Sequence, residues 1–192
     1  MAAESPISMD ELVILRLDGP PEEGFDCGTE QTAFFYERAY EEQQARLSVT
    51  YRYYVHGMLA AFATVCMDAL PLSRRERGGS IRYKEVSALK LAQLGVTLSF
   101  QQMGLGKIVV AHVISQARRE AESVGCRYVT LDARPDLVGW YERQGFQRNE
   151  ARQELRVQEA VTHGRDPAAV AVSMRYDLGE NKKEGDGHPA SR

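Results

Sequence analysis

The feature that most constrains the fold is a strand–turn–helix pattern in the middle of the chain. An apolar run at residues 91–96 leads to a glycine-containing turn at residues 101–107, which opens directly into a helix with apolar side chains on one face. The first backbone N–H groups of such a helix have no partner inside it, and they point outward at the positive end of the helix dipole. The pattern therefore predicts an anion site that suits a pyrophosphate.

Two glycines in the turn strengthen this prediction. At Gly104 and Gly106 a side chain would hold phosphates away from the backbone, and Lys107 would add a point charge. The turn differs from the two commoner phosphate-binding loops, because it has neither the third glycine of a dinucleotide fingerprint nor the Gly-Lys-Ser/Thr of a P-loop. On its spacing alone, an ordinary strand-to-helix connection stays open as the alternative.

This segment resembles motif A of the GNAT acyltransferases. In that motif a strand ends in Leu-x-Val, here Leu94 and Val96, and a short loop leads to Gln/Arg-x-x-Gly-x-Gly/Ala, here Gln101, Gly104 and Gly106. The resemblance implies that amides at the strand end hold the thioester region of acetyl-CoA and that the turn holds its pyrophosphate. The implied cofactor-binding residues are Leu94, Gly95, Val96, Gln101, Gln102, Met103, Gly104, Leu105, Gly106 and Lys107.

A second stretch, residues 137–146, is similar to a short GNAT helix in which Phe/Trp-Tyr is followed by three residues and then Gly-Phe. The tyrosine of this pattern is Tyr141, and the resemblance implies that it points at the cofactor sulfur. When an amine attacks a thioester the leaving group is a thiolate, and a phenol can donate a proton to it as it departs. Alone, the pattern favours a tyrosine packed in the core; its distance from motif A favours a catalytic acid. We interpret Trp140 as a core residue.

Two further segments, residues 25–28 and residues 174–178, resemble parts of the acetyltransferase toxins of bacterial toxin–antitoxin pairs. The resemblance implies aminoacyl-tRNA as the primary-amine acceptor and a ribbon-helix-helix antitoxin as a partner. That acceptor also suits the fourth strand, which has Gln93 but no acid where some relatives place a glutamate base. The α-amine of an aminoacyl ester is largely neutral, because the ester lowers its pKa, so it needs no dedicated base.

Two other functions remain open: a small-molecule or protein amine acetyltransferase outside any toxin pair, and a non-catalytic acyl-CoA-binding module. The segment 149–166, with a predicted helix over 151–162, is longer than expected for the toxins, and it could form a homodimer contact or shape the acceptor pocket. Between residues 71 and 90, six bases face two acids, which predicts either a solvated loop or contacts to phosphates of the acceptor or cofactor. These bases are Arg74, Arg75, Arg77, Arg82, Lys84 and Lys90.

The order of elements, together with the resemblance, predicts an α/β (α+β) GNAT fold with a mixed, mostly antiparallel sheet of six or seven strands and helices on both faces. The strand–helix–strand pattern over 87–133 predicts a right-handed parallel crossover, and His56-Gly57 predicts a hairpin. The resemblance implies that the fourth strand, near 94–96, and the fifth, near 130–132, separate at their ends into a V-shaped cleft. We expect one acetyltransferase domain over 1–178 and a disordered tail over 179–192.

Composition limits the other classes. No run is apolar and long enough to cross a bilayer, and residues 1–10 lack the pattern of a signal sequence. Cys27, Cys66 and Cys126 are odd in number and far apart, so they fit neither a disulfide framework nor a metal site, and we expect a reduced, cytoplasmic setting. The net charge of −3 hides an asymmetry, because residues 1–45 hold eleven acids against two bases and the rest is net positive. This leaves room for a basic face.

Overall fold

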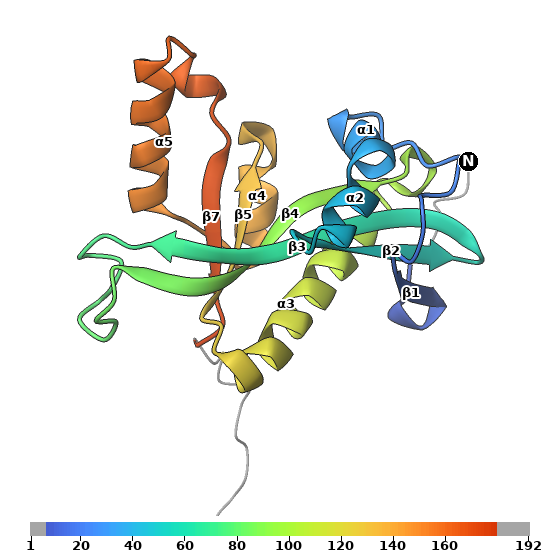
Figure 1. Ribbon diagram of the computed structural model, residues 1–192, viewed down its shortest axis with the longest axis horizontal. Coiled ribbons are helices and arrows are strands. Elements are labelled where there is room, and N and C mark those ends of the chain that lie inside the picture. The colour runs from blue at the N-terminus through green and yellow to red at the C-terminus, as the bar shows by residue number, and fades with distance from the viewer. Residues whose placement is uncertain (1–6, 180–192) are drawn as a thin grey trace, which may run out of the picture.

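The computed structural model describes residues 7–179, and its centre is one seven-stranded sheet with the order β1-β2-β3-β4-β5-β7-β6 (Figure 1). The strands are β1 (Leu12–Arg16), β2 (Val49–Val55), β3 (Met58–Pro71), β4 (Glu85–Val96), β5 (Tyr128–Ala133), β6 (Gln147–Arg148) and β7 (Val172–Asp177). The helices are α1 (Glu30–Glu37), α2 (Ala39–Gln44), α3 (Leu105–Val124), α4 (Val138–Arg143) and α5 (Glu150–Thr162). Short 3-10 turns are η1 (Met9–Glu11), η2 (Leu98–Phe100), η3 (Pro135–Leu137) and η4 (Pro167–Ala169).

Only one neighbouring pair of strands in this sheet is parallel. β4 and β5 run in the same direction with α3 between them in sequence, whereas every other pair is antiparallel. The β2–β3 hairpin turns at His56 and Gly57, which both have the positive φ that a two-residue hairpin loop requires. The prediction of a mixed, mostly antiparallel GNAT sheet is therefore confirmed.

The two faces of the sheet bury different side chains. On β3, Ala61 and Ala63 belong to the main core under α3, whereas Phe62 between them joins the aromatic cluster of α1. Successive strand residues point to opposite faces, so α3 and α1 cover opposite sides of the sheet. The rings of Phe35 and Phe62 stack with their centroids 4.7 Å apart, and Phe35 is fully buried. Helices on both faces were predicted and are present.

Some element boundaries differ from the prediction. The single helix expected over residues 29–47 is two helices, because Arg38 leaves the helical conformation with a φ of −125°. The bend lets α1 bury Phe34 and Phe35 while α2 buries Ala39. The last strand begins at Val172, later than expected, since Pro167 starts a 3-10 turn. Residues 180–192 of the predicted tail lie outside the described residues.

Charged side chains attach α5 to the sheet. Figure 1 shows this helix standing beside β7, apart from α1 and α2. The carboxylate of Glu76, only 3% exposed, accepts hydrogen bonds from the backbone N–H groups of Glu150 and Ala151 at the start of α5 and from Arg175 on β7. Burial alone would raise the pKa of Glu76, but hydrogen bonds from Ser73, with the charge of Arg175, outweigh it and lower the pKa. Glu76 is therefore a buried anion that fixes the start of α5.

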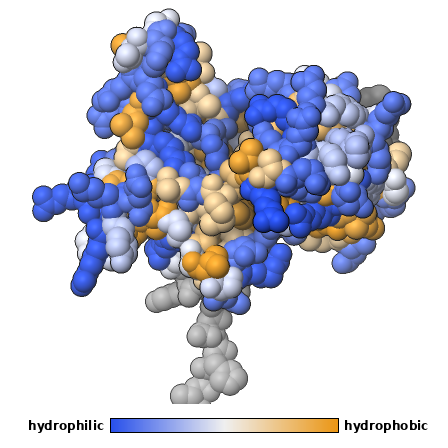
Figure 2. Space-filling model, viewed as in Figure 1, coloured by the Kyte–Doolittle hydropathy of each residue, from blue (hydrophilic) through white to orange (hydrophobic). Residues whose placement is uncertain are grey.

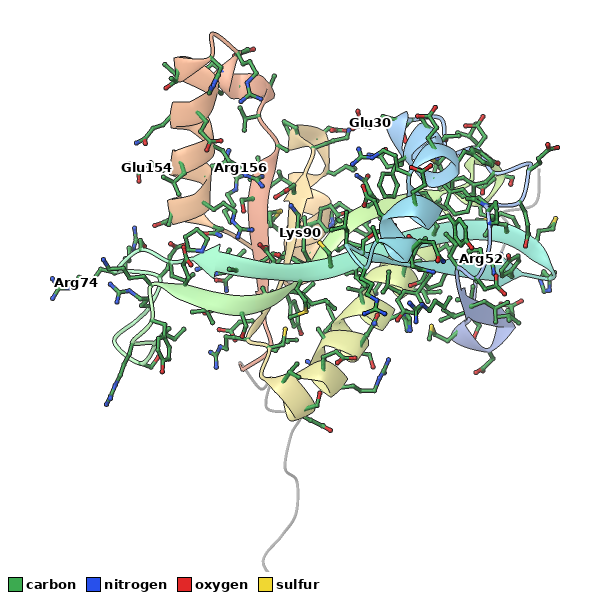
Figure 3. All side chains as sticks on the ribbon, viewed as in Figure 1. Glu30, Arg52, Arg74, Lys90, Glu154 and Arg156 are labelled. Carbon is green, nitrogen blue, oxygen red and sulfur yellow. The ribbon has the colours of Figure 1, made fainter. Side chains whose placement is uncertain are left out.

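Replacing Glu76 tests this attachment. Glu76→Gln leaves Arg175 buried without its counter-ion, and we expect the free energy of unfolding to fall by about 3 kcal/mol. Because the folded pKa is lowered, the carboxylate contributes fully above its ordinary pKa of 4.5, and its contribution is lost as the pH falls through the folded value. Urea unfolding at several pH values should show a shallower acid loss for Glu76→Gln than for the parent. Glu154→Gln, on an exposed outer side chain of α5 (Figure 3), is the control, and equal slopes for all three proteins would contradict the prediction.

Candidate active site

The parallel strands β4 and β5 pair over only part of their length. Their register runs from Ala88 opposite Tyr128 to Leu91 opposite Leu131. Beyond that point β4 pairs only with β3, and β5 pairs only with β7. A bulge marks the place of separation, since Ala92 is an extra residue on β4 relative to β3, and bulges bend the strand that carries them. The predicted splay of the fourth and fifth strands is therefore present, and it leaves backbone groups of both strands free on their facing edges.

A cavity of about 630 Å³ occupies the splay and extends to the start of α3 and to α4. All but one of the predicted cofactor-binding residues line it, and so does the predicted catalytic tyrosine. These residues are Leu94, Gly95, Val96, Gln101, Gln102, Gly104, Leu105, Gly106, Lys107 and Tyr141. The exception is Met103, whose side chain packs against the main core and whose carbonyl accepts a hydrogen bond from Ile7.

The turn before α3 has the conformation that its glycines allow. Gln102 and Gly104 have φ values of 67° and 81°, and Gly104 caps the helix that begins at Leu105. The side-chain amide of Gln101 donates to the carbonyl of Val96 at 3.0 Å and to that of Cys27 at 3.2 Å. Gln101 therefore ties the turn to the end of β4. Its contribution to ligand binding is indirect, because it holds the backbone of the turn in position.

Gly95 is small for a packing reason. A Cβ atom there would lie 2.6 Å from Cε1 of Phe62 and 3.2 Å from both Cys27 and Phe25. Only a residue without a side chain lets this aromatic cluster close against the end of β4. The thiol of Cys27 faces the hydroxyl groups of Thr29 and Thr32, at 3.1 and 3.2 Å.

Tyr141 lies on α4 with its ring packed among aromatic neighbours. Its centroid is 4.8 Å from that of Trp140 and 5.7 Å from that of Phe146, both in edge-to-face contact. The residue is 8% exposed, and burial raises the pKa of Tyr141 to about 12. At neutral pH its hydroxyl therefore keeps its proton and can donate it in a hydrogen bond.

Trp140 was predicted to be a core residue, and it both packs against the core and lines the cavity. It is half-buried against the main core, yet it also lines the cavity, with its indole 3.6 Å from the place where a Cβ of Gly106 would be. The ring thus closes one side of the cavity beside the first turn of α3. Its position next to Tyr141 in the motif was the signal available in the sequence.

Besides Tyr141, the cavity is lined by one carboxylate that the sequence analysis did not single out. Among the described residues that line the cavity, Asp132 is the only acid, and no histidine joins it. Its Oδ2 lies 2.7 Å from Nζ of Lys90, and its Oδ1 lies 2.7 Å from a guanidinium nitrogen of Arg156. Burial alone would raise the pKa of Asp132, but hydrogen bonds from Arg156 and Lys90 outweigh it and lower the pKa. Asp132 is a poor proton acceptor.

The basic segment of residues 71–90 lies elsewhere. None of its six bases lines the cavity, so the described structure gives no support to a contact with cofactor phosphates from this loop. Arg75 instead reaches to 3.7 Å from Glu150 at the start of α5. Only Lys90 comes near the cavity, through its ion pair with Asp132.

A cavity between separated parallel strands, with an anion-binding helix end and a phenol that keeps its proton, suits an acyltransferase. Residues 26–161 match the family model described as acetyltransferase (GNAT) domain, so the chain belongs to the GNAT acetyltransferase family. The prediction of an acyltransferase with acetyl-CoA as co-substrate is thereby confirmed at the level of the family. No curated protein sequence matches the chain significantly.

Solved structures share the fold. AtaT complexed with acetyl-methionyl-tRNAfMet is 21% identical, with a TM-score of 0.66 over 72% of this chain and 88% of its own. A structure described as a bacterial toxin is 18% identical, with a TM-score of 0.70 over 97% and 99% of the two chains. A tyrosine-to-phenylalanine mutant of KacT is 19% identical, with a TM-score of 0.69 over 87% and 95%. Within the described residues, no helix is both long enough and apolar enough to cross a membrane.

The turn's role in anion binding is tested by charge at Gly104. We expect Gly104→Asp to weaken CoA binding about tenfold more than Gly104→Asn, because like charges about 6 Å apart at an effective dielectric of about 40, between protein surface and water, repel by about 1.4 kcal/mol. Both side chains have similar size and tolerate positive φ, so their difference isolates the charge. Calorimetric titration with CoA measures it. The same pair of substitutions at Gly125, which has a φ of 72° at the other end of α3, is the control, and equal affinities at Gly104 would exclude an anion site there.

Proposed function

We propose that this protein transfers an acetyl group from acetyl-CoA to the α-amine of an aminoacyl-tRNA. The observation that supports this acceptor is the lack of a usable base among the described residues that line the cavity. Asp132 is their only acid, and two cations hold its pKa down. An ordinary alkyl amine is protonated at neutral pH and would need a base, whereas the amine next to an ester is largely neutral when it arrives.

The cavity has the parts that acetyl-CoA requires. The backbone N–H groups of the first turn of α3, beside Lys107, suit the pyrophosphate, and the free edge of β4 from Leu94 to Val96 can pair with the pantetheine arm as a further strand would. When bound, the thioester supplies an activated acyl group for direct attack by the amine. The cavity of about 630 Å³ lies within the range of ordinary ligand sites.

Tyr141 acts as a donor toward the departing sulfur. With a pKa of about 12, its hydroxyl stays protonated over the whole physiological range. That pKa is above the value of about 8.5 for an ordinary thiol, so a strong hydrogen bond to the developing thiolate is favoured over complete proton transfer. The residue thus stabilises negative charge where the carbon–sulfur bond breaks, while the buried rings of Trp140 and Phe146 fix its direction.

The molecules bound in the structural neighbours support an aminoacyl-tRNA acceptor and an antitoxin partner. AtaT has been solved with acetyl-methionyl-tRNAfMet, and in other structures with acetyl-CoA and with the C-terminus of the antitoxin AtaR. KacT has been solved in a KacTA–DNA complex. By analogy we propose a toxin that acts in the cytoplasm and is neutralised by an antitoxin of the ribbon-helix-helix type. A homodimer, with residues 149–166 as its contact, stays a prediction.

Removing one hydroxyl tests the role of Tyr141. We expect Tyr141→Phe to lower turnover about 10²-fold, the lower end for a positioned proton donor, and to leave acetyl-CoA affinity within about twofold. Because the pKa is about 12, the ratio of parent to variant rates should stay constant from pH 7 to pH 10. Tyr176→Phe removes a hydroxyl from the same aromatic group outside the cavity and is the control. Equal turnover in parent and Tyr141→Phe would remove Tyr141 from the mechanism.

Expression in bacteria tests the acceptor. We expect growth arrest together with N-acetylated aminoacyl-tRNA, recovered and identified by mass spectrometry, and neither effect from Tyr141→Phe. Acetylation of polyamines or peptides without growth arrest would instead identify an amine acetyltransferase outside a toxin pair. Binding of CoA without transfer to any amine would contradict the enzymatic proposal.

A further inference from the structure

Two arginines one turn apart on α5 each reach an aspartate on the sheet. Arg152 pairs with Asp68 on β3, and Arg156 pairs with Asp132 on β5. Residues four positions apart on a helix lie on the same face, so both side chains point from α5 to the sheet. Figure 3 shows Arg156 directed inward from α5 with Lys90 close by on β4, whereas Glu154 points to the outer side.

The first of these pairs is closed. Arg152 donates to both oxygens of Asp68 at 2.6 and 2.9 Å, and Thr130 donates to the same carboxylate at 2.6 Å. The two charged side chains are only 12% and 15% exposed, and neither residue lines the acyl-CoA cavity or the cavity beside Arg156. A saturated pair of this kind positions a helix and has nothing left to offer a ligand.

The second pair is open. One carboxylate, Asp132, faces the two cations Lys90 and Arg156, so the group carries a net positive charge. The three side chains are each about a quarter exposed, at 24–26%. Arg156 makes one good hydrogen bond to Oδ2 at 2.8 Å, but its other contact, 2.7 Å from Oδ1, does not have hydrogen-bond geometry and leaves Oδ1 buried without a donor. The guanidinium fork of Arg156 is therefore not fully used.

The location of this group connects two cavities. Asp132 lines the acyl-CoA cavity and also a second cavity of about 440 Å³, which Arg156, Glu159, Arg165, Asp166, Ala169, Val170 and Ala171 complete. In Figure 2 a valley separates the lobe that contains α5 from the lobe that contains α1 and α2. A molecule lying against α5 would have the strand splay directly beside it.

The face of the sheet agrees with this arrangement. Leu89 and Leu91 on β4, and Leu131 on β5, point into the core under α3, so Lys90 and Asp132 point to the opposite face. The turn that suits the pyrophosphate belongs to the start of α3. An acceptor that approaches from the α5 face therefore meets the acyl group from the side that the cofactor does not occupy.

We propose that Lys90 and Arg156, held in place by Asp132, form an anion subsite for the acceptor. Its ligand is the phosphate of the terminal nucleotide of an aminoacyl-tRNA, which the ribose and the ester link to the reacting amine. This choice of ligand rests on the proposed function. In this arrangement α5 carries the arginine that recognises the acceptor, Arg156. Arg152, one turn earlier, holds the helix in position.

The test compares acceptors that differ only in a phosphate. Two substrates are 3′-O-aminoacyl adenosine 5′-monophosphate and the same ester of adenosine, assayed by release of CoA. We expect the parent enzyme to prefer the phosphorylated ester, and Arg156→Ala to reduce the ratio of the two kcat/KM values about 10- to 100-fold through the KM of the acceptor, the range for a hydrogen bond to a charged group. Arg156→Lys should restore part of the preference, and the KM of acetyl-CoA should not change.

Two outcomes would overturn the subsite. One is a phosphate preference that persists in Arg156→Ala, and the other is an equal loss of both acceptors together with a lower melting temperature, which would make Arg156 a structural residue. Binding of adenosine 5′-monophosphate and of adenosine to the protein saturated with CoA, measured by calorimetry, gives an arm that does not depend on aminoacyl chemistry. If the parent acetylates neither ester but binds the monophosphate more tightly than adenosine in an Arg156-dependent way, the subsite stands and the aminoacyl-tRNA proposal fails. If neither a phosphorylated acceptor nor the monophosphate is preferred, the subsite fails.

Discussion

The site depends on the point at which the parallel pairing of β4 and β5 stops. If the ladder continued past Leu91 and Leu131, the backbone groups that face the cavity would be satisfied by each other and no ligand could lie between the strands. The extra residue at Ala92 starts the divergence of β4 from β5. Beyond it, the close packing of Phe62 on β3 against Gly95 keeps the end of β4 beside β3 and away from β5. Gln101 then fixes the turn to the end of β4. The direction of the α3 dipole therefore depends on the same separation of β4 from β5.

Features encoded over short distances in sequence could be predicted. The strand, the glycine turn and the helix from residue 91 to residue 124 follow one another along the chain, and the aromatic pair of Trp140 and Tyr141 lies within a single helix. The Asp132 group could not be found in this way, because Lys90, Asp132 and Arg156 are far apart in sequence and only the sheet brings them together. Ion pairs between such distant residues leave no periodic pattern, so composition gives only the total charge.

The two sides of the cavity shift pKa values in opposite directions. Tyr141 packs against the rings of Trp140 and Phe146, and burial raises its pKa. Asp132 is also partly buried, but two cations reverse the effect of burial. The result is one group that keeps its proton and one that stays ionised. Under the proposed function, Tyr141 helps the leaving group, and the acceptor brings a nitrogen that is already neutral.

The helices α1, α2 and α5 cover the same face of the sheet, but they contact it through different kinds of side chain. The α1–α2 pair covers the sheet with Phe35 packed on Phe62, whereas α5 covers it with Arg152 and Arg156 paired to aspartates. Buried ion pairs often add little stability over well-packed apolar residues, since desolvation of the charges offsets their attraction. One closed pair is enough to fix the register of a helix. A second pair that is left partly open, at the junction of two cavities, contributes least to holding the helix and most to what can bind beside it.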